Sequence, residues 1–319
     1  MLTVTAPEGV PEVRAGDDLA DLLLPRVVLA DGDVVAVTSK VVSKAEGRVV
    51  TGDRAEWIEA ETVRDVARRG PTRIVRNRLG LTMAAAGVDA SNVDAGWVVL
   101  LPEDPDVSAR RLRTSLLERS GRNVGVVVTD TAGRTWREGQ TDIAVGAAGL
   151  RVLESFEGRV DAHGNELAVT APAVADEIAS ATELAQGKLG GRPFAVVRGR
   201  SDLVLPPGED GLGAAALVRV EGADLFGYGA REAVVRAVGR APADAAPFGA
   251  PASAEELAEA LRRCGITVTE ADPGHSTLTC AGARDEAVAV LAFAHGWTVA
   301  PAAEPGESGA DLRLRRSTP

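Results

Sequence analysis

The chain is poor in several residue types that carry common protein chemistry. Its 319 residues include only two cysteines, Cys264 and Cys280, which have neither CxxC spacing nor nearby histidines. They therefore form neither a zinc-binding set nor a disulfide framework, and we expect reduced thiols. Aromatic residues make up 3% of the chain, a scarcity that reflects a GC-rich genome more plausibly than a function.

Long apolar runs and a positive net charge are also absent. No run of about 18 apolar residues occurs that would cross a membrane, and the opening MLTVTAPEGVPEV lacks the basic and apolar regions of a signal peptide. The net charge of −11 argues against binding to a nucleic-acid backbone or an anionic bilayer. We expect a soluble, cytoplasmic protein without nucleic-acid or membrane partners, which binds any polyanionic ligand in a locally basic pocket.

The remaining composition, 45% apolar and 25% charged, is typical of a globular protein. Alternating strand and helix patterns predict an α+β fold with several mixed sheets. The chain turns to Ala, Pro and Gly over residues 239–249, which predicts a linker. We therefore expect a main domain over residues 1–245 and a small αβ appendage over residues 246–319. Helices are expected over residues 19–25, 55–69, 106–120, 173–185, 253–263 and 285–295. Strands are expected over residues 34–37, 97–101, 124–129, 151–158, 194–197, 266–269 and 297–300.

The most informative stretch covers residues 126–149, VVVTDTAGRTWREGQTDIAVGAAG. Its apolar strand is expected to stop at Asp130, which with Thr131 offers hard oxygen ligands for Mg²⁺ or Mn²⁺. Arg134 and Arg137 follow, and their planar guanidinium groups suit phosphate or carboxylate. An Asp-Thr pair after a strand is also typical of a turn or a helix N-cap, so the stretch alone leaves both interpretations open.

Three other polar segments follow apolar ones. Ser39, Lys40 and Lys44 come after the expected strand at 34–37 and suit triphosphate oxygens, although a solvated lysine pair fits the same spacing and no P-loop motif is present. Residues 89–94 form either a turn or a second source of metal ligands. The glycine-rich residues 186–193 allow either the close approach of a ligand or a simple helix end.

Together these blocks closely resemble the coenzyme F420-0:gamma-glutamyl ligase family over roughly residues 1–245. The blocks are TSKVVSKAEGRVV, GVDASNVD, TDTAGRTWREGQTDIAVGAAG, and DAHGNEL with ADEIASATELAQGK. The family joins glutamate to the lactyl carboxylate of the deazaflavin coenzyme F420-0. The resemblance implies a two-lobed mixed-sheet ligase fold, a homodimer with the site near its interface, GTP, two divalent ions (Mg²⁺ or Mn²⁺) and K⁺ as a further cation.

The resemblance also implies roles for particular residues. Asp89 and Asp130 match ligands of one metal ion, and Thr131 matches a ligand of the other. The family commonly has a further metal ligand near Lys188, where a protonated lysine cannot ligate. Either the second metal site is lost in this chain, or its missing ligand comes from elsewhere, such as Glu138 or Asp142. The nucleotide-contacting positions are Val10, Pro11, Glu12, Val13, Ser39, Lys40, Lys44, Asn92, Gln186, Gly187, Lys188, Leu189, Gly190, Gly191, Arg192 and Pro193.

The implied reaction explains why these groups are needed. A carboxylate does not react with an amine unless it is first activated, and attack on the γ-phosphorus of GTP would give an acyl phosphate. Arg134 and Arg137 are candidates for binding the substrate phosphodiester or the carboxylates of glutamate, and Glu138 or Asp142 for deprotonating the amine. The competing hypotheses are a metal-dependent nucleotide phosphohydrolase and a nucleotide-binding protein without turnover. The sequence leaves open the number of glutamates added and the preference for GTP over ATP.

Overall fold

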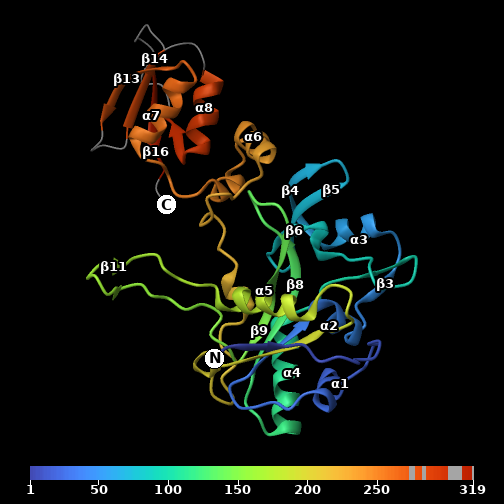
Figure 1. The fold of residues 1–319 in the computed structure, drawn as a ribbon. Helices are drawn as coiled ribbons and strands as arrows, with labels where there is room; N and C mark the ends of the chain where they lie inside the picture. The colour runs from blue at the N-terminus through green and yellow to red at the C-terminus, as the bar shows by residue number, and fades with distance from the viewer. Residues whose placement is uncertain (273–276, 282–284, 301–310, 318–319) are drawn as a thin grey trace. The chain divides into compact units, whose positions relative to one another are not determined.

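The computed structural model describes residues 1–272, 277–281, 285–300 and 311–317 (Figure 1). The chain divides into two compact units, Met1–Val218 and Arg219–Pro319, and each is described by itself. Residues 219–245 thus belong to the C-terminal unit, whereas the sequence pattern placed a boundary at residue 245. The extent of the family domain to residue 245 stays a prediction. No helix in the described ranges is both long and apolar enough to cross a membrane.

The first unit is built on a five-stranded sheet with the strand order β1-β12-β2-β8-β9. β2 and β8 run parallel, and the other neighbouring pairs are antiparallel. The parallel pair is possible because the long chain between the two strands includes the crossover helix α4. The five strands are β1 (Thr3–Thr5), β2 (Val34–Thr38), β8 (Gly125–Gly133), β9 (Gln140–Ala148) and β12 (Phe194–Arg198).

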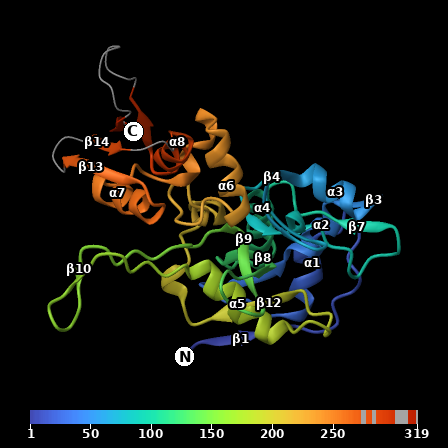
Figure 2. The same cartoon turned by 90° about the horizontal axis from the view of Figure 1, so that it is seen from above.

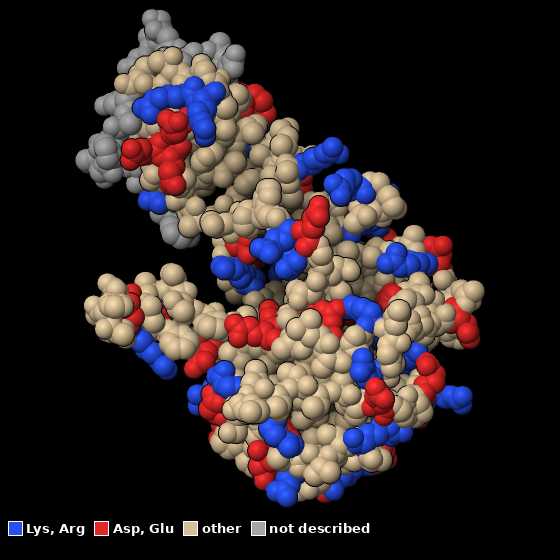
Figure 3. Space-filling view, viewed as in Figure 1, with Lys and Arg blue, Asp and Glu red and all other residues tan. Residues whose placement is uncertain are grey.

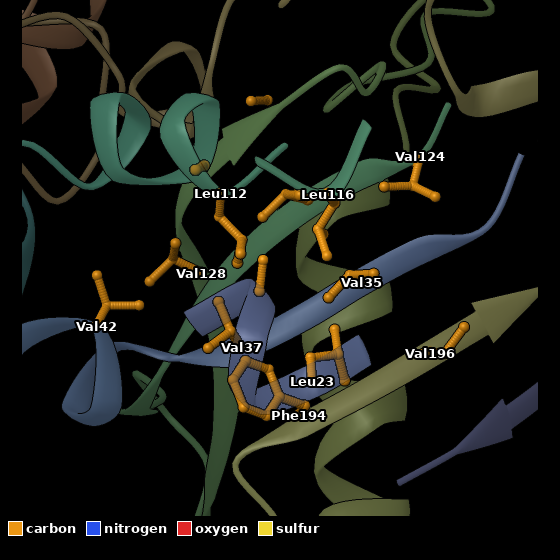
Figure 4. Close-up of a cluster of buried hydrophobic side chains, with 14 of the residues drawn as sticks. Leu23, Val35, Val37, Val42, Leu112, Leu116, Val124, Val128, Phe194 and Val196 are labelled. Atoms are coloured by element: carbon orange, nitrogen blue, oxygen red, sulfur yellow. The ribbon is translucent and has the colours of Figure 1, made fainter. Parts of the chain in front are cut away.

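Helices cover both faces of this sheet. Val126 and Val128 of β8 join the core under α1 and α4, whereas Val127 joins the core under α5, as the alternation of side chains along a strand requires. Figure 4 shows Leu112 and Leu116 of α4 packed over the strand residues of the first core. Burying one such leucine contributes about 1.5–3 kcal/mol. The covering helices are α1 (Leu19–Leu23), α4 (Pro105–Ser120) and α5 (Val174–Gln186).

A second group of elements lies between β2 and α4 in the chain and has its own small core around Ile58, Val75 and Leu100. The helix expected over residues 55–69 is correct only in its first half. The second half, Thr62–Arg69, is strand β4, which turns back at Gly70 to pair with β5. The spacing of acidic and basic residues is typical of a helix. These residues form a strand instead, because they pair with β5. These elements are α2 (Ser39–Ala45), β3 (Val49–Thr51), α3 (Arg54–Glu61), β4 (Thr62–Arg69), β5 (Thr72–Asn77), β6 (Thr82–Ala84) and β7 (Trp97–Val99).

The strand expected over residues 151–158 is also wrong. This stretch leads instead into a small hairpin of β10 (Arg159–Val160) and β11 (Glu166–Leu167), which extends away from the sheet in Figures 1 and 2. The backbone amides of His163 and Asn165 donate to Asp161, which stabilises the turn between the two strands.

The C-terminal unit confirms the expectation of αβ structure after residue 250. Its antiparallel sheet has the order β13-β14-β16-β15 and packs on α7 and α8 through Leu257, Leu261, Val288 and Leu314. Strands β14 and β16 were not among the strands expected from the sequence. The elements are α6 (Ala230–Gly239), α7 (Ala254–Arg263), β13 (Thr267–Asp272), β14 (Thr277–Ala281), α8 (Asp285–Ala294), β15 (Trp297–Val299) and β16 (Asp311–Arg316).

Candidate active site

The candidate site lies at the carboxyl end of β2, where β2 runs parallel to β8. Their register pairs Thr38 with Thr129, so the next residues, Ser39 and Asp130, also come together. The Ser39 hydroxyl donates to Asp130 Oδ1 at 2.7 Å. The prediction that the strand stops at Asp130 is wrong, because β8 pairs with β9 as far as Gly133. Asp130 therefore projects from a rigid strand and not from a loop.

Asp130 and Thr131 face opposite sides of the sheet. Thr129 and Thr131, which alternate with Asp130, both donate to Asp142 on β9, at 3.3 Å and 2.7 Å. A β-bulge interrupts the ladder between Val128 and Thr129, as is common beside active sites. The two residues that the sequence treated as one Asp-Thr pair thus belong to two neighbouring polar clusters.

The surroundings of the Asp130 carboxyl group disfavour its charged form. Burial, together with the negative charges of Asp142 and Asp89, raises the pKa of Asp130 to about 6, although the hydrogen bond from Ser39 opposes this rise. A carboxylate in this position is stabilised by an added cation, because the cation offsets both the lost hydration and the repulsion between like charges.

Asp89 approaches from a different part of the unit. An isolated bridge pairs its backbone with Val99, and its side chain accepts from Lys40 Nζ at 2.6 Å and from the Ser91 hydroxyl at 2.8 Å. Burial alone would raise the pKa of Asp89, but the hydrogen bonds from Lys40 and Ser91 and the charge of Lys40 outweigh it, so the pKa is lowered. Asp89 is therefore held as a carboxylate near Asp130.

Lys44 lies one helical turn beyond Lys40 on α2 and is buried. Its ammonium group pairs with Glu12 and donates to the backbone oxygen of Asn92 at 2.9 Å. The structure thus brings together three residues that the family resemblance assigned to the nucleotide, from three separate segments. It does not do so for every such residue, because Val13 is buried in the core and Val10 packs against it.

The second cluster lies on the α5 side of the sheet. Lys188 Nζ lies 2.8 Å from Thr131 Oγ1 and 3.4 Å from Asp142 Oδ1, and it also pairs with Glu183. Burial alone would lower the pKa of Lys188, but the hydrogen bond that its ammonium group donates to Glu183 and the nearby negative charges raise the pKa, so the lysine stays charged. A protonated lysine therefore occupies the neighbourhood of Thr131, where the resemblance implied a second metal ion.

Sequence reasoning missed Glu183 and its neighbours on α5. Asp176, Ser180 and Glu183 follow an i, i+4, i+7 spacing that places them on one helix face. Asp176 accepts from the amide of Ala144 at 2.8 Å, Ser180 donates to the carbonyl of Asp142 at 2.9 Å, and Glu183 accepts from the amide of Asp142 at 3.3 Å. This polar stripe in an otherwise apolar helix was visible in the sequence.

The glycine-rich residues 186–193 lie beside both clusters. The amide of Thr38 donates to the carbonyl of Pro193 at 3.0 Å, which ties this loop to the end of β2. The Gln186 side chain is buried, and its Oε1 and Nε2 have no hydrogen-bond partner within the described ranges. Buried polar atoms without a partner are costly, so this amide fits a ligand that would satisfy it. Leu189, by contrast, is fully exposed.

The turn between β8 and β9 carries Arg134, Arg137 and Glu138, and all three are exposed. Arg134 donates to the carbonyl of Glu138 at 2.7 Å, which closes the turn on itself. No contact between these three side chains and Asp89 or Asp130 is found within the described residues. Of the four proposed catalytic residues, the structure places only Asp142 inside a cluster, and the roles of the other three stay predictions.

The carboxylates beside Asp130 are the candidate ligands for a divalent cation. The described residues include no group of three or more His, Cys, Asp or Glu side chains arranged around a common metal position. Asp89 and Asp130 nevertheless supply two carboxylates, and phosphate oxygens of a nucleotide would complete an octahedral set for Mg²⁺. Figure 3 shows acidic and basic side chains interspersed over the face in view, so any phosphate site must be local.

Comparison with known proteins points to one family. Residues 9–199 match the model of a family described as F420-0:Gamma-glutamyl ligase. A protein of Archaeoglobus fulgidus named coenzyme F420:L-glutamate ligase is 42% identical over 212 residues, covering 60% of this chain and 85% of the relative. Proteins of the same name from Methanopyrus kandleri and Haloarcula marismortui are each 40% identical, over 236 and 224 residues. These matches cover 67% and 62% of this chain and 93% and 87% of the relatives.

Proposed function

This chain belongs to the F420-0:gamma-glutamyl ligase family, and we propose that it joins L-glutamate by an amide bond to the lactyl carboxylate of coenzyme F420-0, with GTP as the energy source. The observation that carries the proposal is the convergence of Asp130 and Asp89 with Lys40 and Lys44 at the carboxyl end of β2. Acids for a cation and lysines for phosphates in one place are what phosphoryl transfer requires. The homodimer stays a prediction from the family resemblance.

Lys40 and Lys44 are proposed to hold the triphosphate. They lie four residues apart on α2 and therefore project from the same helix face. Without nucleotide, their charges are balanced by Asp89 and Glu12, so GTP would exchange these partners for phosphate oxygens. The buried amide of Gln186 supports a third contact from the glycine-rich loop.

Asp89 and Asp130 are proposed to hold one divalent ion. When bound, such an ion neutralises charge on the phosphoryl oxygens and orients them. Lys188, paired with Glu183 and close to Thr131, supports a different arrangement at the second cluster. We propose that its ammonium group supplies positive charge where the family would place a second ion.

The proposed reaction has two displacements. A carboxylate oxygen of F420-0 forms a bond to the γ-phosphorus as the bond to the β–γ bridging oxygen breaks, which releases GDP and leaves an acyl phosphate. The glutamate amine then forms a bond to the acyl carbon, and inorganic phosphate leaves with the bonding pair. The amine must also lose a proton, for which Asp142, buried beside Thr129 and Thr131, and Glu138, in the exposed turn, are the candidates.

Phosphate release from GTP tests this proposal against the two alternatives. The enzyme is assayed with Mg²⁺ and GTP, with F420-0 and L-glutamate each added alone and then together. A ligase releases phosphate in step with amide formation and needs both cosubstrates for turnover. Equal release from GTP alone would identify a nucleotide phosphohydrolase, and nucleotide binding without release under any mixture would identify a binding protein.

A further inference from the structure

A cavity of about 320 Å³ lies within the first unit, at the start of α4. Its walls come from the loop between β5 and β6, from Pro105 and Arg110 of α4, from Val145 of β9, and from the turn at Ala214–Leu217. Leu79, Leu81 and Val218 add apolar surface. The cavity thus combines an apolar wall with several charged side chains.

The acidic side chains of this cavity already have partners. Asp106 accepts from the backbone amides of Ala147 and Ala214, each at 2.7 Å. Asp104 caps α4 by accepting from the amide of Val107 at 2.9 Å. Glu103, the third acid of the wall, pairs with Arg48 at 3.3 Å. Each of the three acids is therefore already paired with at least one donor of the protein.

The two arginines of the cavity differ in whether their side chains have partners within the protein. Arg78 is fully engaged, because it pairs with Glu61 at 2.7 Å and donates to the carbonyl of Pro102 at 2.6 Å. The Arg110 side chain is half-buried and makes neither a hydrogen bond nor an ion pair with any residue in the described ranges. A guanidinium has five N–H donors, and leaving them unpaired beside apolar surface is costly. Arg110 therefore provides a place for an anionic group.

The cavity lies on the same face of the sheet as Asp130. Val145, which forms part of its wall, and Ile143 both pack against the core under α4, and Ile143 is the cross-strand partner of Asp130. Two residues along a strand span roughly 7 Å. A ligand that fills the cavity and extends along β9 would therefore bring its far end towards Asp130.

We infer that this cavity holds the deazaflavin substrate F420-0, with its planar ring against the apolar wall and its phosphodiester on Arg110. The inference rests on the function proposed above. F420-0 fits because it combines a large flat ring with a single phosphodiester and ends in the carboxylate that must reach Asp130. Free glutamate fits less well, since its ammonium group would meet acids that already have partners.

The test measures F420-0 binding directly and in turnover. Arg110→Ala removes the anion partner, and Ala215→Trp fills the cavity from an exposed wall position without entering the core. The matched control is Arg111→Ala, which removes the neighbouring exposed arginine of α4, outside the cavity. Equilibrium dialysis with F420-0 alone gives Kd, and steady-state assays give KM for F420-0, glutamate and GTP separately.

We expect both cavity variants to raise Kd and KM for F420-0 by about tenfold to a hundredfold, the range for losing a charged hydrogen-bond partner. KM for glutamate and GTP should stay within about twofold of the wild-type value, as should every constant of Arg111→Ala, and Arg110→Lys should recover part of the affinity. Unchanged F420-0 affinity in both cavity variants, or a rise in the glutamate KM alone, would overturn the inference. If the wild-type protein binds F420-0 but adds no glutamate, the proposed function fails while the dialysis still decides the cavity.

Discussion

Replacing Asp130 by asparagine should make the metal-free protein more stable while removing its response to divalent cations. At pH 7.5 Asp130 is ionised in a setting that burial and two neighbouring acids make unfavourable, with its pKa raised from 3.8 to about 6. At about 1.36 kcal/mol per pKa unit, that difference corresponds to roughly 3 kcal/mol. Because the side chain is partly exposed and solvent screens it, we expect a gain of about 1–2 kcal/mol in the free energy of unfolding. Ser39 can still donate to the amide oxygen of the variant.

The pH dependence gives the sign of this effect. A carboxyl group whose pKa is higher in the folded protein binds its proton more tightly there, so its contribution to stability is full below about pH 4 and is lost as the pH rises to about 6. The difference in unfolding free energy between Asp130→Asn and the wild type should therefore be small near pH 4 and largest above pH 7. Urea unfolding with EDTA, repeated across this range, measures it.

Added Mg²⁺ tests the functional half of the same prediction. A cation that binds only the folded state raises the unfolding temperature of the wild-type protein as the cation concentration rises above the dissociation constant, and Asp130→Asn should lose that shift. Asp176→Asn is the control, because burial also raises the pKa of Asp176 and its carboxyl lies on α5, away from the proposed ion. Lower stability of Asp130→Asn in EDTA at pH 7.5, or an unchanged Mg²⁺ shift, would refute the reasoning.

Three further predictions follow from single contacts. Lys188→Gln should lower kcat by about tenfold to a hundredfold if the ammonium group beside Thr131 replaces a second ion, whereas a rise in kcat would show that the lysine excludes one. Lys44→Met should raise KM for GTP by about tenfold or more and leave KM for glutamate unchanged; equal rises in both would contradict its assignment to the triphosphate. Gly146→Ala should destabilise the fold by about 1–3 kcal/mol, because a Cβ there would lie 2.3 Å from the Pro105 carbonyl oxygen. The control Gly133→Ala meets no atom within 4 Å and should change stability little. Equal unfolding temperatures of the two variants would contradict this reasoning.

Regular patterns made much of this fold predictable. The runs of valine indicated strands β2 and β8, and the helical spacing of Leu112 and Leu116 indicated α4. Both patterns show which side chains are buried in the core. Strand β4 was mistaken for a helix because its charges repeat at a helical spacing, and only pairing with β5 shows that it is extended.

The candidate site was predictable as a set of residues but not as an arrangement. Motif blocks selected Asp89, Asp130 and Lys40, and the structure brings these side chains together. The sequence could not show that Asp130 and Thr131 face opposite sides of the sheet, since that depends on β8 continuing past Asp130. Nor could it show that Lys188 reaches Thr131 and Asp142, because those contacts depend on where α5 packs on β9.

One isotope experiment tests the central claim most directly. F420-0 carrying ¹⁸O in its lactyl carboxylate is incubated with GTP, Mg²⁺ and L-glutamate, and the coenzyme and the inorganic phosphate are both analysed by mass spectrometry. Amide formation through an acyl phosphate predicts a coenzyme heavier by a glutamyl unit and one ¹⁸O atom in each phosphate released. Phosphate without ¹⁸O, beside unchanged F420-0, would contradict the account.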